Sequence, residues 1–68
     1  MLTGGDVRAE RNRHTPVVTQ DELQEEMGWK VRGVAGLIEN GEIEATQPQL
    51  QKMLDTIERI VARRTETT

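Results

Sequence analysis

The chain has 68 residues, with no Cys, one His and a formal net charge of −3. A chain this short forms one domain, whose core supplies only about 3–5 kcal/mol of stability without further reinforcement. The lack of Cys excludes disulfides and thiolate metal sites, and His14 alone cannot build a structural zinc site. The longest apolar run, 34–38, is far below the roughly 20 residues of a membrane span. We therefore expect a soluble, cytoplasmic protein with no metal or cofactor.

The remaining composition favours helices. Trp29 is the only aromatic residue, which argues against a β-sandwich or barrel core. Charged residues make up 31% of the chain, and the apolar residues are mostly Val, Leu, Ile, Ala and Met. That mixture suits short amphipathic helices, so the expected fold class is all-α.

Residues 1–18 are expected to form a flexible basic arm. Three arginines stand there against two carboxylates, for a net charge of +1. Residues 7–13 suit one or two helical turns with Asp6 as the N-cap, but an isolated helix that short is marginal in water. The arginines fit either a solvated tail or an arm that contacts nucleic acid; they are Arg8, Arg11 and Arg13.

The next segment begins with a strong helix signal. Thr19 and Glu22 have the spacing of a capping box, in which each side chain bonds the other residue's backbone amide. Gly28 stands where a glycine commonly ends a helix. This pattern predicts a helix over 20–27, followed by a tight turn.

A second helix is predicted over 30–39 by apolar residues at helical spacing: Val31, Val34, Leu37 and Ile38. Asn40 and Gly41 would end it. Gly33 and Gly36 inside this helix each cost about 1 kcal/mol relative to Ala. They fit either the close approach of another backbone or ligand, or a weakness tolerated by packing.

The last predicted element is a long amphipathic helix. Thr46 and Gln49 repeat the capping-box spacing, and an apolar stripe follows: Leu50, Met53, Leu54, Ile57, Ile60 and Val61. The domain would thus cover 19–64, with a frayed tail at 65–68. Because two short helices cannot cover the whole stripe, we expect a homodimer that buries its far end, at Ile57, Ile60 and Val61.

Two short helices, a glycine-containing turn and a longer closing helix make the outline of a helix-turn-helix bundle of three to four helices. The sequence resembles the Cro/repressor-type (xenobiotic-response-element) helix-turn-helix domains over about residues 7–57. The segments that carry the resemblance are Thr19-Gln20-Asp21-Glu22-Leu23, Met27-Gly28-Trp29, Val34 and Ile38-Glu39-Asn40-Gly41.

The spacing departs from that family in two places. One residue more than usual lies between Gly28 and Asn40, so the recognition helix must shift or its turn must lengthen. About two extra residues also lie between Arg11 and Gln20. A weaker similarity to excisionase/MerR-like helix-turn-helix domains covers 28–43, but that family needs a basic β-wing, whereas an acidic linker and a helix follow here.

The Cro/repressor resemblance implies a small sequence-specific DNA-binding transcriptional regulator, of the kind that phages and mobile elements encode. It implies that Gln20 contacts a phosphate and that Lys30 and Arg32 enter the major groove. Asn40 and the three arginines of the arm would contact the DNA backbone or the minor groove. A two-fold homodimer would place half-sites about 34 Å apart, and the protein would be associated with the nucleoid.

Residues 19–45 also support a different class of function. They hold two basic and seven acidic residues, a net charge of −5, whereas phosphate binding normally shows a basic footprint. The alternative is a helix-turn-helix-shaped module that binds a host protein, as an antitoxin or a phage inhibitor does. We expect no enzymatic activity, because a cluster of glutamates on a short exposed helix is a solvated face rather than a catalytic site.

Overall fold

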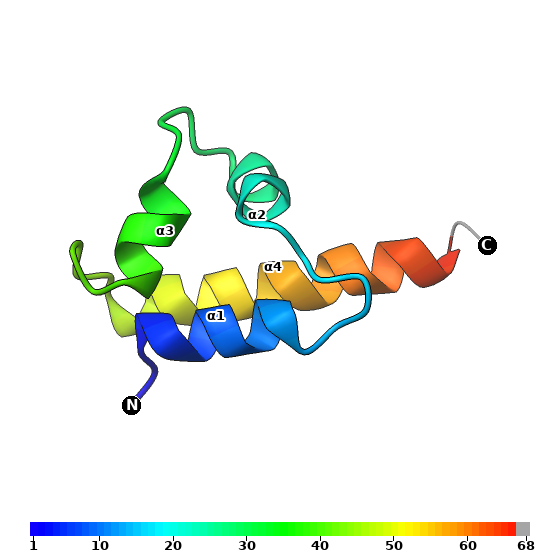
Figure 1. Cartoon of the computed structure of the whole chain (residues 1–68), viewed down its shortest axis with the longest axis horizontal. Coiled ribbons are helices and arrows are strands. Elements are labelled where there is room, and N and C mark those ends of the chain that lie inside the picture. Colours follow the sequence, from blue (N-terminus) through cyan, green and yellow to red (C-terminus); the bar gives the residue numbers. More distant parts are fainter. Residues whose placement is uncertain (67–68) are drawn as a thin grey trace.

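The computed structural model describes residues 1–66 and contains four α-helices within them: α1 (Gly4–Asn12), α2 (Gln20–Met27), α3 (Val34–Glu39) and α4 (Gln47–Glu66). The predicted all-α class and the long C-terminal helix are both confirmed. In Figure 1, α1 and α4 run side by side in the same direction; α2 packs against α4, and α3 packs against α1 and α2. None of the described helices is both long and apolar enough to cross a bilayer.

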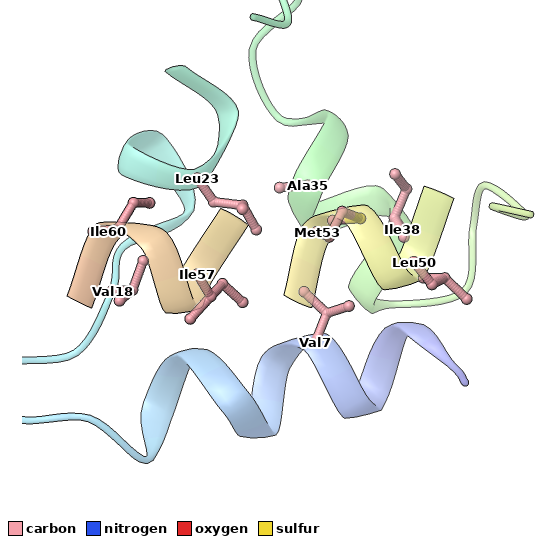
Figure 2. Close-up of a cluster of buried hydrophobic side chains, with 9 residues drawn as sticks. All are labelled: Val7, Val18, Leu23, Ala35, Ile38, Leu50, Met53, Ile57 and Ile60. Carbon is pink, nitrogen blue, oxygen red and sulfur yellow. The ribbon is translucent and has the colours of Figure 1, made fainter. Parts of the chain in front are cut away.

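The core is built along α4, which packs against residues from every other helix (Figure 2). Its central residue Met53 is fully buried between Val7 of α1 and Ala35 of α3. The connection between α1 and α2 contributes Val18, which is also fully buried. The buried apolar residues are Val7, Val18, Leu23, Ala35, Ile38, Leu50, Met53, Ile57 and Ile60.

Helix α1 differs from the flexible arm that was predicted for residues 1–18. It begins at Gly4, and its N-cap is Thr3, whose hydroxyl oxygen accepts a hydrogen bond from the Asp6 amide at 3.3 Å. Asp6 is thus the third helical residue of a capping box rather than the N-cap. The helix is stable because Val7 is buried against the rest of the bundle, which an estimate for an isolated helix leaves out.

Helix α2 is confirmed as predicted. Thr19 accepts a hydrogen bond from the Glu22 amide at 3.1 Å, and Glu22 accepts one from the Thr19 amide at 3.2 Å. Gly28 ends the helix in the left-handed conformation, with φ of 78°. These contacts join residues at most four positions apart, so the sequence alone predicts them well.

Helix α3 begins at Val34, four residues later than predicted. Gly33 has a φ of 84°, which side-chain-bearing residues rarely adopt, and it forms the N-cap of α3 rather than an interior turn. The turn between α2 and α3 therefore runs over 28–33. Gly36 lies within α3, where a Cβ atom would come within 3.1 Å of the Gln20 side-chain oxygen. The neighbour at Gly36 is thus the end of a side chain and not another backbone or a ligand, so the close-approach interpretation is not confirmed there.

Helix α4 extends to Glu66, so the part of the predicted frayed tail at 65–66 is helical, and 67–68 lie outside the described residues. Ile57 is fully buried and Ile60 is 6% exposed within a single chain, while Val61 is half-buried. The stripe that we expected a second copy to cover is thus covered by this chain's own α1, α2 and α1–α2 connection. The predicted dimer interface at these residues loses its basis.

Polar contacts fasten the end of α4 to the first half of the chain. The Arg63 guanidinium donates to both carboxylate oxygens of Glu26, at 2.6 and 2.8 Å. Arg64 donates to the backbone carbonyl of Pro16 at 2.5 Å and lies 3.3 Å from the Glu22 carboxylate. The long connection between α1 and α2 is thereby held against α4.

The close approach of α1 to α3 predicts different effects for two neighbouring glycines. A Cβ atom at Gly4 would collide with the carbonyl group of Ile38 and lie 2.9 Å from the Glu39 Cα. We therefore expect Gly4→Ala to lower the free energy of unfolding by about 1–3 kcal/mol, as overpacking does. Urea denaturation followed by circular dichroism measures this change.

Gly5→Ala is the matched control, because a Cβ atom there meets only the Thr3 hydroxyl, at 3.5 Å. Ala is the better helix former, so we expect this variant to be as stable as the wild type or more so. Equal stability of the Gly4 and Gly5 variants would contradict the close packing of α1 on α3.

The Glu26–Arg63 pair predicts a pH effect. The hydrogen bonds from Arg63, helped by its charge, hold the pKa of the Glu26 carboxyl below its ordinary value of 4.5. Such a carboxylate stabilises the fold above its unfolded pKa, and this contribution is lost as pH falls through the lower, folded pKa. We expect Arg63→Met to raise the pKa of Glu26 in an NMR titration, whereas Lys52→Met leaves it unchanged. An unchanged Glu26 titration in Arg63→Met would show that the pair does not form.

Candidate nucleic-acid interface

A buried ion pair joins α1 to the end of α3. The Arg11 guanidinium donates from Nε to one carboxylate oxygen of Glu39 at 2.8 Å and from Nη2 to the other at 2.6 Å. Its remaining nitrogen, Nη1, donates to the Val18 carbonyl at 2.9 Å. The Glu39 side chain is 0% exposed and that of Arg11 is 8% exposed. This bidentate geometry is the strongest form of arginine–carboxylate pairing, and it orients α3 relative to α1.

Helix α2 supports α3 at both of its ends. The Gln20 side chain donates to the Glu39 carboxylate at 3.4 Å, which adds a third donor to the buried charge. The buried Gln24 side-chain oxygen accepts a hydrogen bond from the Ala35 amide at 2.9 Å. That amide lies in the first turn of α3, where backbone donors have no partner inside the helix. A helix of six residues is thus held at its beginning and at its end.

The surface left outside this support consists of the turn before α3 and the outer face of α3. Lys30, Val31 and Arg32 are all exposed in the turn. On α3, Ala35 and Ile38 face the core, so Leu37 lies on the exposed side of the helix. In Figure 1 this turn projects away from the layer formed by α1 and α4.

The two cations of the turn differ from most others in the chain. Within residues 1–66, no carboxylate is recorded within 4.0 Å of Lys30 or Arg32. Five arginines elsewhere do have such a carboxylate: Arg8, Arg11, Arg13, Arg63 and Arg64. Lys30 and Arg32 are therefore available to an anionic ligand without first breaking an ion pair.

The arginines of α1 are less available than the sequence predicted. Arg11 is buried in its pair with Glu39 and cannot reach a ligand. Arg8 lies 3.8 Å from the Glu39 carboxylate, and Arg13 lies 3.0 Å from that of Glu10. Arg11 is buried because it follows Val7 by four residues and therefore lies on the same buried face of α1.

The other predicted contact residues are divided between the interior and the surface. Gln20 is half-buried, and its side chain is bonded to Glu39, which turns it toward the interior rather than toward a phosphate. Asn40 is exposed at the C-cap of α3. The structure therefore places Lys30 and Arg32 before α3 and Asn40 after it, whereas the side chains of Gln20 and Arg11 are bonded to Glu39.

Carboxylates flank the interface on both sides. Asp21 and Glu25 of α2 line the same surface hollow as Lys30 and Arg32. After α3, the exposed linker carries Glu42 and Glu44. The cationic region is therefore small and bounded by negative charge, and an anionic ligand must approach along the turn itself.

Sequence reasoning missed the buried polar residues that hold α3. Glu39 follows Ala35 by four residues, and Gln24 follows the buried Leu23 directly. Arg11 follows the buried Val7 by four residues, as Glu39 follows Ala35. For Arg11 and Glu39, the signal was a charged residue four positions after a core residue. Two such positions of opposite charge predict a buried pair.

Comparison with known proteins does not assign a family. No protein-family model, no curated protein and no solved structure matches the chain. Within residues 1–66, there is no group of three His, Cys, Asp or Glu side chains that could hold a metal ion. The exposed turn over 28–33 and the outer face of α3 form the candidate site.

The buried pair predicts a strong and non-additive effect of mutation. Removing one partner leaves the other charge buried and unpaired, which costs about 3–5 kcal/mol. We expect Glu39→Leu and Arg11→Met each to unfold most of the protein at 25 °C, because a core of this size supplies about the same free energy. Circular dichroism and urea denaturation measure the loss.

The double variant Arg11→Met/Glu39→Leu tests whether the pair is the cause. It removes both buried charges together, so we expect it to recover much of the helix content that either single variant loses. Losses that simply add in the double variant would rule out the coupling of these two residues.

Proposed function

We propose that this chain is a small sequence-specific DNA-binding transcriptional regulator, which contacts duplex DNA through the α2–α3 turn and the outer face of α3. The observation that carries the proposal is the pair of exposed turn cations, Lys30 and Arg32, for which no carboxylate is recorded within 4.0 Å in residues 1–66. The resemblance of 19–41 to Cro/repressor-type domains supports the same function.

The chemistry of the turn suits DNA. An Arg guanidinium presents two parallel donors that match the O6 and N7 acceptors of guanine in the major groove. Lys30, only two residues from Arg32, is suited to a backbone phosphate, which fixes the orientation of a protein on the duplex. Hydrogen bonds hold α3 at both ends, so the helix that follows the turn is positioned before a ligand binds.

A protein-binding module is the second candidate, and the flanking carboxylates favour it. Asp21, Glu25, Glu42 and Glu44 would repel phosphates on either side of the turn. A partner protein with a basic rim would instead be attracted to them. The salt dependence of binding separates the two candidates, since only binding to DNA involves the release of condensed counterions.

The proposal predicts a defined result when the purified protein selects fragments from genomic DNA. We expect one recovered sequence whose affinity falls steeply with salt. Lys30→Ala and Arg32→Ala should each weaken binding, and loss of a phosphate contact should lower the slope of log K against log[salt] by about 1. Titration by fluorescence anisotropy at several salt concentrations measures both quantities.

Lys52→Ala is the matched control, because Lys52 is an exposed lysine on α4, outside the proposed interface. Its removal changes the net charge by the same amount as Lys30→Ala. If all three variants bind equally, or if no sequence is enriched, the DNA proposal fails and the surface is assigned to a protein partner.

A further inference from the structure

Two apolar side chains are exposed at the proposed interface. Val31, between the cations of the turn, is 67% exposed, and Leu37 on α3 is 37% exposed. Val31 lies in the turn between Lys30 and Arg32, and Leu37 lies on the exposed side of α3. Exposed apolar groups gain free energy only when a ligand covers them, so their chemistry indicates what the ligand offers at those positions.

Gly33 leaves the backbone beside the turn open. A Cβ atom there would have no neighbour within 4 Å. A ligand edge can therefore approach the turn closely, where it meets the exposed Val31.

The major groove of DNA presents one apolar group, the 5-methyl group of thymine. The edges of the other bases are hydrogen-bond donors and acceptors, which an apolar side chain desolvates without replacing their bonds. Lys30 and Arg32 favour an anionic ligand, and the exposed side chains of Val31 and Leu37 favour thymines within it.

We propose that Val31 and Leu37 contact thymine methyl groups, so that the DNA site carries thymines next to the base or phosphate bound by Arg32. This inference rests on the proposed DNA-binding function. It goes beyond that function by naming the bases that the apolar residues prefer and the atoms through which they do so.

Replacing thymine by deoxyuridine tests the proposal, because it removes only the methyl group and keeps every hydrogen bond of the base pair. The recovered DNA site is synthesised with one replacement at a time and titrated with the protein. We expect about a fourfold loss of affinity at each contacted thymine, the equivalent of about 0.8 kcal/mol for one methyl group.

Two variants assign the contacts. Val31→Ser should bind the thymine and deoxyuridine forms of one position equally, and Leu37→Ser should do the same at another position. Val17→Ser is the matched control, since Val17 is 45% exposed but lies in the α1–α2 connection, where Arg64 of α4 donates to its carbonyl. It should keep the full preference for thymine, and circular dichroism verifies that each variant is folded.

The outcomes separate this inference from the function on which it rests. A preference for thymine that disappears in Val31→Ser supports the inference. Specific binding with no effect of deoxyuridine, or an effect that persists in both Val31→Ser and Leu37→Ser, overturns the inference and leaves the DNA-binding function in place. If no DNA sequence is enriched, both fail.

Discussion

The buried pair between Arg11 and Glu39 is the interaction on which the arrangement of the first three helices depends. It joins α1 to the end of α3, and the same guanidinium holds the carbonyl of Val18 ahead of α2. A buried charge is costly unless all of its hydrogen bonds are made. Here the carboxylate receives donors from Arg11 and Gln20, and this demand for complete pairing leaves few other ways to place α3.

The short helix α3 shows the effect of this constraint. Six residues do not form a stable helix in water, so α3 depends on contacts at its ends and on the burial of Ala35 and Ile38. Gln24 satisfies an amide in its first turn, and the ion pair holds its last residue. The exposed side of α3 takes no part in this support and is therefore free to carry residues chosen for a ligand.

The charge distribution follows the same division between support and surface. Although the net charge is −3, the carboxylates near Arg8, Arg11, Arg63 and Arg64 are engaged in pairs that hold helices together. The cations of the turn have no such role. A small acidic protein can thus present a local cationic surface, since the potential near a ligand depends on nearby charges within about a Debye length of 8–10 Å.

The sequence by itself determined the all-α class, the caps of α2 and the long helix α4, because these depend on residues three or four positions apart. It also predicted DNA contacts for Lys30, Arg32 and Asn40, and the structure leaves these residues exposed. Only the tertiary structure decided that α1 is a packed helix, that α3 begins at Val34, and that Arg11 and Gln20 face inward. It also decided that Ile57 and Ile60 are covered by their own chain. Each of these depends on contacts between segments distant in sequence, where burial outweighs local helix preference and solvation of charge.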